Sequence, residues 1–309
     1  MIERLNRFLG QSISMRSLGI VRMLVGAITL LHLREFVEPA LEGDTYQDYF
    51  YNPYVAWYPE LPEPAYAALL VLGCIAAVAM CAGLWTQVVT KVTFGVVAYN
   101  LLLSTTHVHN NRAYLAIVLG LLALAPCGRA FSLDALWRRL RGRPFEATGP
   151  AYPLWLLRFE AVAVYAASGF SKLIDPDWFG GTVTYWRMVT IEANVRASWL
   201  PEAFADLVVN RDFHTVIAKV IVGTELFIAA GLWWRWTRPF AVLAAIGFHV
   251  MIEVTSNVQI FSYLCLAMLF IWADPAMPWL RDPKGWLRRA RGYWRPAEAA
   301  GVAASQSRS

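Results

Sequence analysis

Three short segments hold most of the side chains that could do chemistry, although they lie far apart in the chain. They are residues 107–111 (His-Val-His-Asn-Asn), 171–178 (Ser-Lys-Leu-Ile-Asp-Pro-Asp-Trp) and 253–257 (Glu-Val-Thr-Ser-Asn). Imidazole, amine, carboxylate and amide groups can together move protons and orient a polar ligand. Each segment lies at the end of an apolar stretch. We therefore expect a site only if the fold brings these three ends to one face.

Lys172 is the most informative of these residues because lysine is rare here, with four residues among the 27 lysines and arginines. It is expected at the outer end of a helix, packed among Phe170, Leu173 and Trp178. Removal from water disfavours the ammonium form there, which would make the amine a general base. The alternative is a lysine whose charged end only reaches out to the membrane surface.

The histidines give weaker signals. His107 and His109 flank a turn closed by Asn110 and Asn111. A His-x-His pair with no nearby cysteine or carboxylate is a poor metal site, so no metal is expected. His249 precedes Glu253 by one helical turn, and we expect a packed core histidine hydrogen-bonded to that carboxylate.

The composition indicates a membrane protein. The chain of 309 residues is 58% hydrophobic and 16% charged, whereas about 25% charged residues are usual in soluble domains. A net charge of +5 could indicate nucleic acid, but the arginines flank apolar stretches, where they orient the chain and contact anionic lipid. No nucleic-acid partner is therefore expected. The four cysteines lie in or beside apolar stretches and are interpreted as buried, inert thiols.

The predicted fold is an all-α polytopic bundle of about eight transmembrane helices with one amphipathic interfacial helix. The apolar stretches lie at 18–33, 64–85, 87–105, 113–125, 151–170, 213–234, 239–254 and 258–272. Ser132 can cap an amphipathic helix that carries arginines up to Arg143, and the alternative is a basic loop. The polar segment 173–212 is either a lid lying on the membrane surface or a simple connector.

The distribution of positive charge predicts the orientation. With the N-terminus inside, the inner segments hold seventeen Lys and Arg residues and the outer ones about five. Inner segments carry the excess in membrane proteins. We therefore expect a multi-pass protein of the plasma membrane with both termini cytoplasmic and the three polar segments facing outward. Residues 1–280 would form the transmembrane domain and residues 281–309 a basic, partly disordered tail.

Several charged residues interrupt the apolar stretches, among them Arg22, Arg158, Glu160, Lys219, Glu225 and Glu253. An ionised side chain in the membrane costs at least ~2.5–3.5 kcal/mol, so each one should have a partner. We expect structural ion pairs, for instance Arg22 or Arg158 with Glu225, because a buried pair can fix helix register without doing chemistry.

Several segments in order resemble the HTTM family, the membrane domain shared with vitamin K-dependent γ-carboxylase. The resemblance runs from Ser17 to about Pro278. It is carried by residues 17–22 (Ser-Leu-Gly-Ile-Val-Arg), 110–115 (Asn-Asn-Arg-Ala-Tyr-Leu), 131–134 (Phe-Ser-Leu-Asp), 157–158 (Leu-Arg) with 169–173 (Gly-Phe-Ser-Lys-Leu) and 177–178 (Asp-Trp), and 248–249 (Phe-His) with 261–263 (Phe-Ser-Tyr).

The resemblance implies that Lys172 is the base that deprotonates a reduced naphthoquinone, such as menaquinol or vitamin K hydroquinone, held in the membrane. The deprotonated quinol then reacts with oxygen to give the strong base that drives carboxylation of a glutamate. Asn111 falls on an asparagine of the quinol site. The other residues expected to line it are Asn110, Arg112, Tyr114, His107, His109 and His249.

Two departures from the family pattern qualify this reading. Arg112 stands where the carboxylase has a histidine. After the last apolar stretch we also expect no counterpart of the large lumenal domain that binds the carboxylase's protein substrate. The substrate is therefore expected to be small or a short peptide. The alternative is a non-catalytic membrane factor for maturation or export of a small secreted peptide. A transporter is weaker, because no matching halves with broken helices occur.

Overall fold

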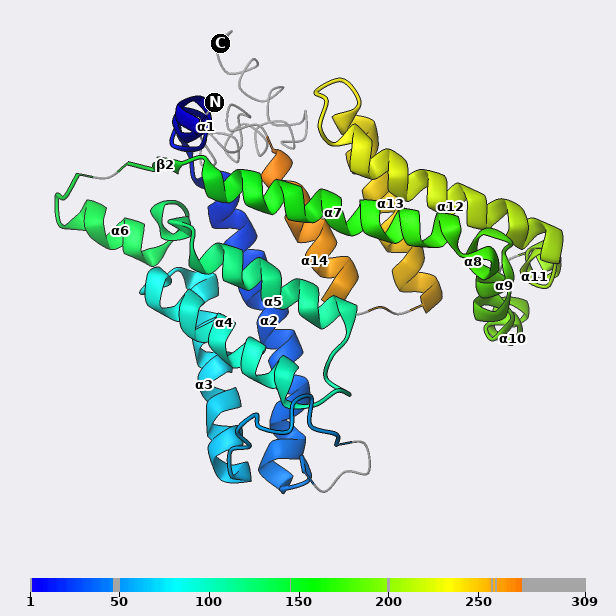
Figure 1. Ribbon diagram of the computed structural model, residues 1–309, viewed down its shortest axis with the longest axis horizontal. Helices are drawn as coiled ribbons and strands as arrows, with labels where there is room; N and C mark the ends of the chain where they lie inside the picture. Colours follow the sequence, from blue (N-terminus) through cyan, green and yellow to red (C-terminus); the bar gives the residue numbers. More distant parts are fainter. Residues whose placement is uncertain are drawn as a thin grey trace, which may run out of the picture. The chain divides into compact units, whose positions relative to one another are not determined.

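The computed structural model describes residues 2–46, 51–144, 146–198, 201–256, 258 and 260–273. Residues 2–272 belong to one compact unit, and this unit is almost entirely helical (Figure 1). The predicted basic tail, 281–309, lies outside the described residues, as does Asn257 of the third polar segment.

Each of the eight predicted apolar stretches forms a helix. They are α2 (Arg16–Glu42), α3 (Glu63–Ala82), α4 (Thr86–Leu103), α5 (Asn110–Ala123), α7 (Tyr152–Ile174), α12 (Arg211–Gly231), α13 (Arg238–Ser256) and α14 (Ile260–Met268), which continues as the 3-10 helix η2 (Leu269–Trp272). Within the described residues, four of these, α3, α4, α12 and α13, are long and apolar enough to cross a membrane. The all-α fold is confirmed, and the number of eight crossings stays a prediction.

Short elements connect the long helices. They are α1 (Ile2–Leu9), β1 (Ser12–Ser14), the 3-10 helix η1 (Cys127–Arg129), α6 (Leu133–Leu140), β2 (Thr148–Pro150), α8 (Pro176–Phe179), α9 (Thr182–Val189), α10 (Glu192–Arg196) and α11 (Glu202–Val208). Strands β1 and β2 pair antiparallel, with Ile13 opposite Gly149. This small ribbon ties the segment before α2 to the segment before α7.

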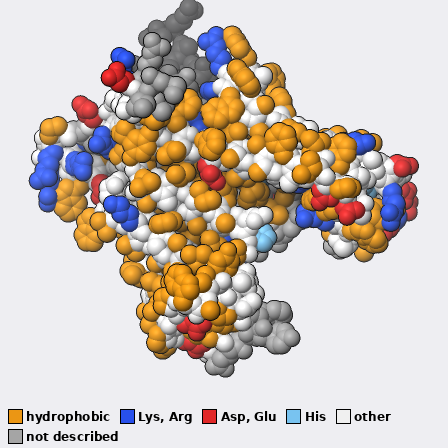
Figure 2. Space-filling model, viewed as in Figure 1, with side chains coloured by type: hydrophobic (Ala, Val, Ile, Leu, Met, Phe, Trp, Pro, Cys, Tyr) orange, Lys and Arg blue, Asp and Glu red, His pale blue; other side chains and the backbone are white. Residues whose placement is uncertain are grey.

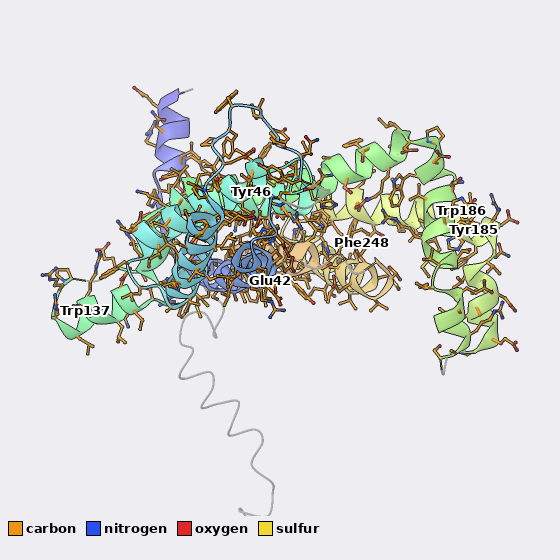
Figure 3. The ribbon with its side chains drawn as sticks, turned by 90° about the horizontal axis from the view of Figure 1, so that it is seen from below. Glu42, Tyr46, Trp137, Tyr185, Trp186 and Phe248 are labelled. Carbon is orange, nitrogen blue, oxygen red and sulfur yellow. The ribbon has the colours of Figure 1, made fainter. Side chains whose placement is uncertain are left out.

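The predicted amphipathic helix is present as α6. The Oγ of Ser132 accepts a hydrogen bond of 2.9 Å from the backbone N–H of Ala135, as expected of a helix cap. Leu136, Trp137 and Leu140 are exposed, and Trp137 lies at the edge of the molecule in Figure 3. Apolar side chains also cover much of the face drawn in Figure 2, as expected of a protein surrounded by lipid.

Small residues allow the helices to approach closely. A side chain at Gly26 of α2 would come within 2.9 Å of the backbone nitrogen of Cys81 in α3. Leu33 of α2 and Val96 of α4 fill the space over Gly73 in the same way. Close approach at small residues is a common route to helix association in membranes. Consecutive helices α2 to α5 therefore pack side by side.

The polar segment after α7 folds into the short helices α8 to α11, of which α8, α9 and α11 contact α12. Gly181 has a left-handed φ of +85° and lies directly against the backbone of His214, where no side chain would fit. Thr184 of α9 also donates a hydrogen bond to the His214 carbonyl at 3.4 Å. Trp186 is exposed (Figure 3). This arrangement is compatible with either predicted role, and Trp199 and Leu200 lie outside the described residues.

The expected pairing of Arg22 or Arg158 with Glu225 is wrong. The fully buried Arg22 donates from Nη2 to the Phe131 carbonyl at 2.6 Å. Arg158 donates from Nε and Nη2 to the Ile271 carbonyl at 3.2 and 3.0 Å. Both acceptors lie in turns or at helix ends, where carbonyls lack partners within a helix. The two arginines therefore fasten neighbouring segments rather than form ion pairs.

Candidate functional site

Lys172 lies in the last turn of α7 and takes part in a closed set of hydrogen bonds. Its Nζ donates to Oε1 and Oε2 of Glu225 in α12, at 2.6 and 2.8 Å. It also donates to Oγ of Ser168 at 2.6 Å. The Ser168 hydroxyl in turn donates to Oε1 of Glu225 at 2.8 Å. We call these three residues the lysine cluster.

The lysine cluster is largely shielded from solvent. The side chains of Lys172 and Glu225 are 15% and 4% exposed, and Nζ lies 5.0 Å from the centre of the Trp178 ring. Gly169 allows α7 and α12 to lie close together here, because a Cβ there would come within 2.9 Å of the Leu226 side chain. The amine is therefore directed at a carboxylate instead of reaching out to the membrane surface.

His249 lies on the neighbouring helix α13 and is bound to α7. Its Nε2 is 2.8 Å from the hydroxyl of Tyr165, and the ring is fully buried between Phe248 and Phe261. The expected hydrogen bond to Glu253 is wrong, because the imidazole turns toward α7. Tyr165 lies two turns before Lys172 on α7, and Ser168 lies between them. Spacings of three and four residues place all three on one helix face.

A second polar group joins α2, α3, α4 and the start of α5. The Nδ1 of His107 is 2.8 Å from the Asn100 carbonyl, and Tyr66 donates to the Asn100 side chain at 2.6 Å. Arg112 donates to the His107 carbonyl at 3.3 Å and stacks over Phe36. Burial lowers the pKa of His107, and the charge of Arg112 acts in the same direction, whereas the hydrogen bond to Asn100 raises it. The neutral form of the His107 imidazole is therefore favoured relative to a free histidine.

The remaining predicted residues lie around the start of α5. His109 caps the helix by accepting a hydrogen bond from the backbone N–H of Asn111 at 3.3 Å. The Asn111 side chain donates to the Val258 carbonyl at 3.4 Å, which ties α5 to the connection between α13 and α14. Asn110 is exposed. Tyr114 is buried with its ring 6.1 Å from that of Phe261.

The predicted residues therefore fall into two neighbouring groups. Tyr114 and His249 both contact Phe261, and His249 is joined through Tyr165 to the helix face that carries Lys172. His107 and Arg112 belong to the other group. Within the described part of the chain, no hydrogen bond or ring contact links Lys172 directly to Asn111. Also within this part, no three His, Cys, Asp or Glu side chains are close enough together to hold a metal ion.

Sequence reasoning missed four polar members of these groups: Ser168, Tyr165, Asn100 and Tyr66. The spacing of Ser168 and Lys172, four residues apart, was an available signal for the first. Glu225 was identified as a charged residue but given the wrong partner. Nothing in the sequence near Glu225 indicates Lys172, because that pairing depends on how α12 is rotated against α7.

A family model for the HTTM domain matches residues 11–277, nearly the whole of the described chain. Comparisons with curated proteins and with solved structures find no match. The HTTM domain is a membrane domain related to γ-carboxylase, and the long apolar helices α3, α4, α12 and α13 agree with a membrane location. The family match and the helices lead to one conclusion: the chain belongs to the HTTM family of membrane proteins.

Proposed function

We propose that this protein performs proton chemistry on a lipid-soluble quinol in the membrane, with Lys172 as the base. The observation that carries the proposal is the lysine cluster, an amine and a carboxylate 2.6 Å apart with 15% and 4% of their side chains exposed. Perturbed or paired titratable groups in shielded places are typical of functional sites. The location in the plasma membrane, with both termini cytoplasmic, belongs to the same proposal.

The residues around His249 suit a flat, hydroxylated ring. Two buried polar atoms of α13, Nδ1 of His249 and Oε2 of Glu253, have no hydrogen-bond partner among the described residues. Buried polar atoms without partners are uncommon and call for an explanation. The rings of Phe248 and Phe261 provide apolar surfaces beside them. A reduced naphthoquinone would supply an acidic hydroxyl group and the electrons for reducing oxygen.

Glu225 makes the base assignment chemically workable. An ammonium cannot accept a proton, so Lys172 must first release one, and Glu225 is its nearest acceptor, at 2.6 Å. The transfer leaves an amine and a carboxylic acid, both uncharged, which suits an apolar environment. The amine then takes a proton from the ligand hydroxyl and becomes an ammonium again. The proton ends on Glu225, and Lys172 remains as the positive charge beside the ionised oxygen.

The other predicted residues have supporting parts in this proposal. Asn111 and Tyr114 would line the site next to α13 and α14, where they already lie. His107 and Arg112 would act from the neighbouring group, with His109 and Asn110 at its exposed edge. No contact in the described chain gives these four residues a direct role at Lys172.

The test is quinone binding by the protein reconstituted in lipid nanodiscs. Quinones quench tryptophan fluorescence at short range, and Trp178 lies 5.0 Å from the lysine amine. We expect saturable quenching by a naphthoquinone, with a clear part of it lost in Trp178→Phe. Trp137→Phe, at the distant helix α6, is the matched control and should leave the quenching intact. Absence of saturable quenching would overturn the proposal.

The rival function is a non-catalytic factor for maturation or export of a secreted peptide. One observation favours it: both charges of the lysine cluster are fully hydrogen-bonded, as they would be in a pair that only holds α7 and α12 in register. Lys172→Arg separates the two functions, because arginine keeps the pair but does not release its proton. Peptide maturation should survive this change, whereas quinol chemistry should not.

A further inference from the structure

Two arginines converge on one tryptophan ring toward the end of α7 that is opposite to Lys172. The guanidinium carbon of Arg158 lies 4.8 Å from the centre of the Trp272 ring, and that of Arg238 lies 5.3 Å from it. Arg158 belongs to the second turn of α7, Arg238 begins α13, and Trp272 ends η2. The turn between α12 and α13 and the end of α14 both lie toward the top of Figure 1. We call these three side chains the arginine–tryptophan cluster.

The cluster carries two positive charges that the described residues do not neutralise. Arg158 donates only to the backbone carbonyl of Ile271, and Arg238 donates only to two carbonyls directly after α12. A carbonyl satisfies an N–H group but cancels no charge. Neither arginine forms an ion pair with an Asp or Glu of the described chain. Like charges beside one ring repel each other, and a bound anion would relieve that repulsion.

Three nitrogen atoms of the cluster have no acceptor among the described residues. Trp272 is 4% exposed, and its indole Nε1 is buried without a hydrogen bond. Nη1 of Arg158 and Nη1 of Arg238 also make none, although both side chains are half-buried. A buried donor without an acceptor costs free energy that a ligand oxygen would recover. A phosphate carries several acceptor oxygens on one centre, so it can accept from the indole and from both guanidiniums together.

The cluster lies at a membrane boundary. Helices α12 and α13 are each long and apolar enough to cross a membrane, and the turn that joins them carries Trp234 and Trp236, which are 62% and 74% exposed. Exposed tryptophans of this kind mark the level of the lipid headgroups. Arg238 comes two residues after Trp236 and therefore lies near that level. The sequence that follows the cluster, 274–309, holds seven Lys and Arg residues against three Asp and Glu, so it adds to the attraction for an anionic surface.

We propose that the arginine–tryptophan cluster binds the phosphate group of an anionic phospholipid. Guanidinium groups match phosphate oxygens through paired N–H donors, and basic pockets between transmembrane helices are suited to such headgroups. A zwitterionic lipid has the same phosphate but carries its own cation, so it relieves less of the repulsion between the two arginines. Free inorganic phosphate offers the same oxygens without acyl chains. The bound lipid holds α7, α13 and η2 together, at a site separate from Lys172.

Native mass spectrometry of the full chain in detergent micelles measures its affinity for added dioleoylphosphatidylglycerol and dioleoylphosphatidylcholine. We expect phosphatidylglycerol to bind at least about ten-fold more tightly, because two arginines face the headgroup. Arg238→Gln should weaken its binding about ten-fold. Trp272→Phe keeps an aromatic ring and removes the N–H, and it should weaken binding about five-fold. Inorganic phosphate should not displace the lipid.

Arg235→Gln is the matched control, because Arg235 is exposed on the same turn and stacks over Trp236 at 4.3 Å. It removes the same charge and should change the affinity less than about two-fold. Circular dichroism checks that each variant is folded, and Trp272→Phe decides the matter if Arg238→Gln is not. Equal affinity for the two lipids would overturn the proposal. So would displacement by inorganic phosphate, which would make this a free-phosphate site, or an equal loss in Arg235→Gln, which would indicate general surface attraction.

Discussion

Removing one partner of the lysine cluster should destabilise the protein far more than removing both. Lys172 and Glu225 lie 2.6 Å apart with 15% and 4% of their side chains exposed. At an effective dielectric constant of 20 their attraction is on the order of 6 kcal/mol, which is an upper bound because burial of the charges offsets part of it. Lys172→Met or Glu225→Leu leaves one buried charge unpaired, at a cost of about 3–5 kcal/mol.

The double variant Lys172→Met/Glu225→Leu leaves no buried charge, and apolar replacement of a whole buried pair is often neutral. We therefore expect it to be within about 1 kcal/mol of the wild type. The free energy of unfolding can be measured in mixed micelles by titration with a denaturing detergent, with circular dichroism as the readout. The exposed pair of Arg196 and Glu192 is the control, and its removal should change nothing measurable. Additivity of the two single changes within about 0.5 kcal/mol would refute the reasoning.

Three further predictions follow from neighbouring contacts. Gly169→Val should destabilise the protein by about 1–3 kcal/mol and weaken naphthoquinone binding, because the new side chain meets Leu226 and separates α7 from α12; unchanged quenching titrations would argue against this. Tyr165→Phe should cost about 0.5–1.5 kcal/mol because it removes the hydrogen bond to His249, and unfolding titrations check it. Burial lowers the pKa of His107 in the folded protein, so the stability that the neutral imidazole contributes should be complete above pH ~6.5. That contribution should be lost as the pH falls toward the lowered pKa of the folded protein. His107→Gln should flatten this decline of the free energy of unfolding with pH, and an identical pH profile for the variant would contradict the assignment.

Much of the helical framework could be predicted from the sequence because its signals are local. Apolar runs predicted all eight long helices, and Ser132 followed by an amphipathic run predicted α6. Helix ends were less predictable, since α2 continues to Glu42 well beyond its apolar run. How many of these helices cross the membrane depends on charge and length together. Eight crossings were expected from the sequence, and four helices of the described residues satisfy both criteria.

The partners of buried charges could not be predicted because they depend on how helices are rotated and spaced. Gly169 brings Glu225 to Lys172, and this effect depends on the facing helix. Arg22 and Arg158 bind backbone carbonyls. Because every residue has a carbonyl, the residue type at the acceptor position gives no signal for this hydrogen bond. For the same reason His249 bonds to Tyr165 in another helix rather than to Glu253 in its own.

Oxygen uptake with a reduced naphthoquinone tests the central assignment most directly. It should be compared in nanodiscs between the wild type and Lys172→Arg, which preserves the positive charge beside Glu225 but cannot accept a proton from the ligand. Unfolding titrations on the same samples ensure that both proteins are folded. The account predicts protein-dependent uptake in the wild type and only the background rate in Lys172→Arg. Equal uptake by both proteins, or none above background in either, would contradict the role of Lys172 as the base.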